Sequence, residues 1–151
     1  MSSQKAIADR IIDILGTNSD IKQRGYFSMR NWSLWPAFAV RQAGSSQQWV
    51  ADDLKQKIVN YEIVGYILPL EGGIQTYSEQ AVITWIDTID DLFDTRPTLG
   101  LTGYSDAMAG VQDSFIVTNT GFFPLTVSNS VYAACIWTLQ VTLLAQLQKG
   151  F

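Results

Sequence analysis

The chain has 151 residues, of which 47% are hydrophobic, and this predicts a single folded domain spanning residues 1–151. The net charge is −4, which argues against a protein that grips nucleic acid through a basic surface. With one cysteine, Cys135, an internal disulfide is excluded, and the absence of histidine removes the commonest general base and zinc ligand.

The N-terminal residues lack the charged start and apolar run of a signal peptide, which favours an intracellular protein. The longest apolar stretch, residues 131–147, is interrupted by threonine and glutamine, so we expect no membrane span.

The first predicted element is a helix over residues 4–15. Its apolar residues fall on one helical face: Ile7, Ile11, Ile14 and Leu15. Gly16 follows directly, where a left-handed C-cap is expected.

Residues 17–36 form a polar segment that contains several aromatics. Three cations make this segment locally basic: Lys22, Arg24 and Arg30. Two interpretations stay open, a surface loop whose Tyr26, Phe27 and Trp32 tuck onto the body, or a contact loop for a partner.

Two strands are predicted next, over residues 36–42 and 56–68. The connection over residues 43–55 is too long for a tight turn, and it allows the hairpin to project beyond the globule.

The second predicted helix begins with a possible capping box, Thr76 and Glu79, and ends before Pro97. Its apolar residues repeat at intervals of three and four: Val82, Trp85, Ile86, Ile89, Leu92 and Phe93.

The sequence pattern of the C-terminal third predicts strands. Residues 111–119 read as a strand, and residues 120–130 as a loop or short hairpin. Residues 131–147 alternate with period two, which predicts a long strand with Trp137 and Val141 in the core. Because the strand is unusually long, we expect a bend, a bulge or an extension past the sheet.

This element order predicts an α+β protein, a two-layer sandwich with a mainly antiparallel sheet of four or five strands and both helices packed on one face.

An acidic motif lies in the second helix. Asp90, Asp91 and Asp94 match D-D-x-x-D, the pattern with which isoprenoid synthases hold diphosphate through magnesium, and Asp87 lies nearby. Those enzymes are longer and carry two such motifs in an all-helical fold, so we interpret the four aspartates as the wet side of an amphipathic helix. No phosphate-binding loop is present, and Cys135 reads as a core thiol. We therefore expect no catalytic, cofactor or metal site.

The aspartates lie near the helix C-terminus, where the helix dipole disfavours negative charge. Three candidates can neutralise the charge of these aspartates: Arg96, a neighbouring subunit, or a divalent ion at a subunit interface.

Four segments of the sequence resemble the tail terminator proteins of long-tailed bacteriophages, which are also called tail-to-head joining proteins. They are the opening helix "AIADRIIDILG", the proline-entered strand "WPAFAVR", the turn "RPTLGLTG" and the closing strand "CIWTLQVTLL". The sharpest match is Thr98-Leu99-Gly100, where the family often has a second glycine and this chain has Leu101.

This resemblance implies a structural virion protein and no enzyme. Such proteins form a six-membered ring that caps the tail tube, stops its growth and joins it to the neck at the head-proximal end of the tail. DNA passes through the ring without specific binding. The implied partners are other copies of the chain, the tube protein and neck proteins. The alternatives are a head-closure or connector protein, or a monomeric small-molecule-binding domain.

Two stretches are candidates for the subunit contacts of such a ring. Trp49 and Val50 lie in the polar connection 43–55, and adjacent Phe122 and Phe123 lie in residues 119–130. We also expect the acidic end of the second helix (Asp87, Asp90, Asp91 and Asp94) to face a basic patch such as Lys22, Arg24 or Arg30.

Overall fold

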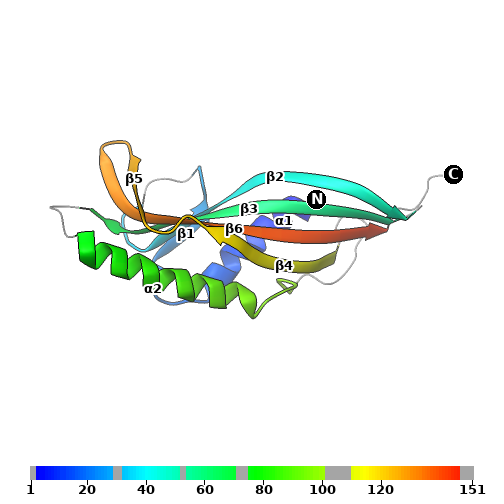
Figure 1. Ribbon diagram of the computed structural model, residues 1–151, viewed down its shortest axis with the longest axis horizontal. Coiled ribbons are helices and arrows are strands. Elements are labelled where there is room, and N and C mark those ends of the chain that lie inside the picture. The colour runs from blue at the N-terminus through cyan, green and yellow to red at the C-terminus, as the bar shows by residue number, and fades with distance from the viewer. Residues whose placement is uncertain (1–2, 29–31, 52–53, 71–74, 101–109, 147–151) are drawn as a thin grey trace.

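A computed structural model describes residues 3–28, 32–51, 54–70, 75–100 and 110–146 (Figure 1). The elements in chain order are α1 (Ser3–Leu15), β1 (Gln23–Tyr26), β2 (Ala37–Ala51), β3 (Leu54–Pro69), α2 (Gln75–Asp94), β4 (Gly110–Asn119), β5 (Phe123–Val127) and β6 (Ser130–Gln146). The predicted α+β class with a mainly antiparallel sheet is confirmed, and the sheet has six strands in place of the expected four or five.

The strands follow the order β1-β2-β3-β6-β4, and β5 pairs with the start of β6. Every pairing is antiparallel except that of β1 with β2. The long predicted strand is β6, which pairs with β3 from Tyr132 to Gln146, while the register shift in that pairing falls in β3.

The main core lies on one face of this sheet. Trp137 and Val141, the two predicted core residues of β6, are fully buried there. Ile7 and Ile11 of α1 and Ile89 of α2 belong to the same hydrophobic cluster. The packing of both helices on one face of the sheet stays a prediction.

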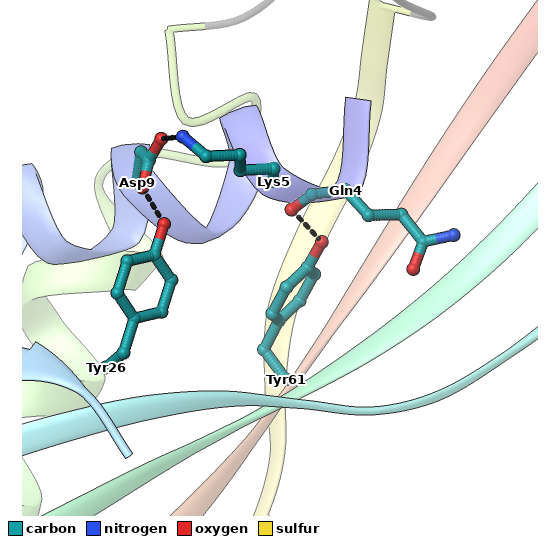
Figure 2. Close-up of polar contacts among 5 residues, drawn as sticks. All are labelled: Gln4, Lys5, Asp9, Tyr26 and Tyr61. Carbon is teal, nitrogen blue, oxygen red and sulfur yellow. Dashed lines mark hydrogen bonds and ion pairs between the residues drawn. The ribbon is translucent and has the colours of Figure 1, made fainter. Parts of the chain in front are cut away.

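Polar contacts tie α1 to the sheet (Figure 2). The Tyr61 hydroxyl of β3 donates to the Gln4 carbonyl oxygen at 2.8 Å. The Tyr26 hydroxyl of β1 donates to the Asp9 carboxylate, which also pairs with Lys5 at 2.8 Å.

The C-terminus of α1 differs from the prediction. Gly16 is not among the residues with positive φ, so the expected left-handed cap is wrong. The Arg24 guanidinium carbon lies 2.5 Å from where a Cβ of residue 16 would be, so a side chain at position 16 would require the flexible end of Arg24 to move.

The opposite face of the sheet carries a second cluster. It is built on Ala39, Val64 and Tyr66, against which Phe27 and Trp32 pack. For Phe27 and Trp32, the interpretation as aromatics that tuck onto the body is therefore confirmed. The short strand β1 was not predicted, because its four residues, Gln23–Tyr26, are too few to show a period.

Hydrogen bonds from α1 and β4 fix the tight turn that follows α2. Arg10 of α1 donates from Nε to the Leu99 carbonyl oxygen at 2.8 Å, and the Ser114 hydroxyl of β4 donates to the Pro97 carbonyl oxygen at 2.9 Å. Leu99 and Gly100 both have positive φ, at 55° and 72°, and the Gly100 conformation favours glycine.

Candidate subunit interface

The sheet extends at one end into an arm, which we define as residues 43–51 of β2 and 54–58 of β3 together with the part of β6 that pairs with them. Figure 1 shows these strands running past the C-terminal end of α2. Most of the predicted connection over residues 43–55 is strand, since β2 continues to Ala51 and β3 begins at Leu54, and the hairpin extends away from the helices as the sequence allowed. Pairing with β3 overrides the low strand propensity of the Gly, Ser and Gln residues in this stretch.

Trp49 and Val50 lie near the arm tip. Their exposed fractions are 59% and 48%, so the predicted exposure of both residues is confirmed. The Lys55 ammonium nitrogen lies 5.5 Å from the centre of the Trp49 ring, a cation–π contact that orients the indole. The arm tip thus presents an apolar surface beside a cation.

The outer edge of β2 is open along the arm. From Arg41 to Ala51 every residue is exposed, and β1 covers β2 only between Ala37 and Val40. Residues 42–51 contain no charge and no proline. Such an edge presents unpaired N–H and C=O groups and lacks the charges and prolines that block strand addition, although two register shifts interrupt β2, between Gln42 and Ser45 and between Trp49 and Ala51.

The opposite edge of the sheet is β4. Phe115 and Val117 on this strand are 42% and 50% exposed. Two register shifts, between Val111 and Asp113 and between Ile116 and Thr118, interrupt its pairing with β6. The β4 edge therefore offers apolar side chains that sequence reasoning missed, because residues 111–119 read as an ordinary strand.

Phe122 and Phe123 are not exposed aromatics. Phe122 is half-buried and packs against the main core, and Phe123 is half-buried at the start of β5. The expected exposure of both side chains is wrong, because β5 pairs with β6 and turns this stretch into a hairpin, while their part in subunit contacts stays a prediction.

The four aspartates of α2 differ in burial. Asp87, Asp91 and Asp94 are exposed, as the amphipathic pattern predicts. Asp90 is half-buried, and its Oδ1 is buried without a hydrogen-bond partner. Burial raises the pKa of Asp90, and the charges of Asp94, Asp87 and Asp91 raise it further. The interpretation of all four as the wet side is therefore wrong for Asp90.

Arg96 does not neutralise this acidic row. Its Nη1 donates to the Leu92 carbonyl oxygen at 2.9 Å and so satisfies one of the last carbonyls of α2. Within the described residues, the ion pairs are Lys5 with Asp9 and Arg41 with Glu62, so the α2 aspartates have no cationic partner there.

The predicted basic patch is only partly visible. Lys22 and Arg24 are exposed on and just before β1, and the Arg24 guanidinium lies over the end of α1. They do not meet the aspartates in an ion pair within the described part of the chain. Arg30 lies outside the described residues.

The chemistry of these groups does not point to a reaction. Burial raises the pKa of the Cys135 thiol, which keeps it protonated at neutral pH and weakens it as a nucleophile. No cluster of His, Cys, Asp or Glu that could hold a metal ion is found among the described residues. In the described part of the chain, neither helix has the length and apolar composition needed to cross a membrane.

Comparison with known proteins gave no match to a protein-family model and none to a curated protein sequence.

Proposed function

We propose that this protein is a structural protein of a phage virion. It forms a ring of identical subunits, six by the resemblance of its sequence, at the head-proximal end of the tail tube. The ring stops tube growth and joins the tail to the neck. The resemblance over the opening helix, the Thr98-Leu99-Gly100 turn and the closing strand supports this proposal.

One structural observation carries the proposal: the sheet has two different open edges, each with exposed apolar side chains. Trp49 and Val50 lie on β2, and Phe115 and Val117 lie on β4. A ring needs two different patches on each subunit, and edge-to-edge pairing of strands is a common mode of association.

The directions of the strands suit this association. β2 runs antiparallel to β3, β3 to β6 and β6 to β4, so β2 and β4 of one subunit point in opposite directions. A neighbour in the same orientation therefore places its β2 antiparallel to β4. The pairing repeats from subunit to subunit and closes into a ring if each step adds a rotation.

The charge of the chain also fits. A subunit with a net charge of −4 has little affinity for the phosphate backbone, so DNA can pass through such a ring without being held.

The experiment is electron microscopy of the purified protein alone and after addition to tail tubes of the same virus, with mass measurement in solution. We expect rings on the open ends of tubes and a halt in tube growth. Binding to portal-side neck proteins but not to tubes would identify a head-closure or connector protein instead. A monomer that binds neither would overturn the proposal.

A further inference from the structure

We infer that the acidic row of α2 (Asp87, Asp91 and Asp94) docks on Lys22 and Arg24 of the next copy of this chain. The inference rests on the proposed ring, and it assigns a partner to charges that have none within the described part of one subunit.

The rows of paired residues across the sheet place the two groups at nearly the same level. Arg24 pairs with Phe38, Phe38 with Gly65, and Gly65 with Cys135, so these four residues form one row from β1 to β6. Trp85 of α2 packs against Phe38 of this row, with ring centroids 5.5 Å apart. The acidic row therefore begins about half a helical turn beyond the level of Arg24.

Both groups belong to the helix-bearing face. Arg24 and Tyr26 are the partners of Phe38 and Val40, which lie in the main core, and both side chains reach toward α1. α2 contacts β4, β6 and β3, whereas α1 contacts β1 and β2. When β2 of one copy approaches β4 of another, α2 of the second copy becomes the neighbour of α1 and β1 of the first.

The surfaces match in character as well as in position. On α2, Ile83, Asp87, Asp91 and Asp94 follow each other at intervals of four, four and three residues, which aligns them along one flank. Ile83 is 52% exposed, and on the facing side Tyr26 is 36% exposed. An apolar contact beside the opposite charges would lower the local dielectric constant and strengthen the attraction between those charges.

The decisive experiment reverses charges on each side. One variant carries Asp87→Lys and Asp91→Lys, and the other carries Lys22→Glu and Arg24→Glu. Each variant alone brings like charges together at every contact of the ring. We expect the apparent dissociation constant for assembly, measured by sedimentation, to rise about tenfold or more.

An equimolar mixture of the two variants should assemble again. When the two variants alternate around the ring, opposite charges meet at every contact. The new lysines of α2 face the new glutamates at positions 22 and 24, and the native aspartates of α2 face the native Lys22 and Arg24. Strict alternation closes only in a ring with an even number of subunits, so the mixture also reports on the ring order. Assembly of the wild-type protein should weaken as salt is raised, because screening reduces the attraction.

Glu79→Lys is the control, since it makes the same charge change as one of the two α2 substitutions, about two turns before Asp87, and should leave assembly unchanged. Circular dichroism of dilute monomer separates loss of assembly from loss of folding, which matters for Arg24 because it packs against Gly16. Carbodiimide, which joins carboxylates to amines in direct contact, should link the Asp87 or Asp91 peptide to the Lys22 peptide only in the assembled fraction.

The inference is overturned if either reversal leaves assembly as it is in the wild type, if the mixture fails to recover, or if the wild type never self-associates. If the mixture assembles but no ring caps a tail tube, the proposed contact is supported and the proposed function is refuted. If rings cap tubes but the mixture does not assemble, the proposed function is supported and this contact is refuted.

Discussion

Asp90 differs from the other carboxylates of α2 in its surroundings. Its Oδ1 is buried without a partner, and its pKa is raised, first by burial and then by Asp94, Asp87 and Asp91. The folded protein therefore binds this proton more tightly than the unfolded chain does. Ionisation of Asp90 lowers the free energy of unfolding as pH rises above the ordinary value of 3.8, and this cost is absent below it.

We predict that Asp90→Asn raises the free energy of unfolding at pH 7 by less than about 1 kcal/mol, since Asp90 keeps part of its hydration. The difference should shrink below pH 3.8, where the wild-type carboxyl is protonated in both states. Urea denaturation at both pH values measures this, with exposed Asp91→Asn as the control. A loss of stability at pH 7 would mean that the carboxylate has a stabilising partner.

The alternation of β6 permits a sharper test. Val141 is fully buried, whereas Gln140 is half-buried and its side chain points to the other face of the sheet. Val141→Asp places an unpaired carboxylate in an apolar layer, at a cost of several kcal/mol against a total stability of about 5–15 kcal/mol. We expect a largely unfolded variant by circular dichroism, while Gln140→Leu stays folded. Equal stability of the two variants would contradict the register.

At the scale of elements, α1 is held on the sheet by apolar packing and by two tyrosines. Burial raises the pKa of Tyr61, whose hydroxyl donates to the Gln4 carbonyl oxygen, so this tyrosine stays neutral well above its ordinary range. Tyr26 reaches the same helix further along, at Asp9, from a more exposed position.

We predict that Tyr61→Phe lowers the free energy of unfolding by about 0.5–1.5 kcal/mol, the usual contribution of one buried hydrogen bond. Hydrogen exchange should show faster opening of α1 amides. Tyr26→Phe, which removes a bond at a more exposed site, should cost less by the same measurement. If the Tyr26 variant has the lower free energy of unfolding, the exposed contact stabilises the packing of α1 more than its exposure indicates.

At the scale of the whole molecule, the arm and the β4 edge serve no evident purpose inside one subunit. We predict that Trp49→Ser combined with Phe115→Ser blocks ring formation and leaves the monomer folded, because both side chains lie outside the buried core of the isolated subunit. Mass measurement follows assembly, and thermal unfolding of dilute protein follows folding. Rings that form normally from this variant would exclude the two edges as the contact surface.

Phe122→Ser is the contrasting variant. Phe122 packs against the main core, so its loss should lower thermal stability before it affects assembly. An unchanged melting temperature together with lost assembly would return Phe122 to the contact surface that the sequence suggested.

The amino-acid sequence by itself determined the elements whose periodicity is long and regular. The apolar positions of α1, such as Ile7 and Ile11, and the alternating residues of β6, such as Trp137 and Val141, all reach the core, because a helix or strand must bury its apolar face. These patterns were sufficient for the α+β class.

Only the tertiary structure decided the rest. Residues 43–51 have no strand pattern and become strand because β3 offers them a partner, and Gln23–Tyr26 becomes a strand beside β2 for the same reason. Asp90 and Phe122 looked exposed in sequence, yet Asp90 is half-buried in the folded chain and Phe122, beside the β5–β6 hairpin, packs against the main core. Burial depends on neighbours that are distant in the chain, and local periodicity carries no record of those neighbours.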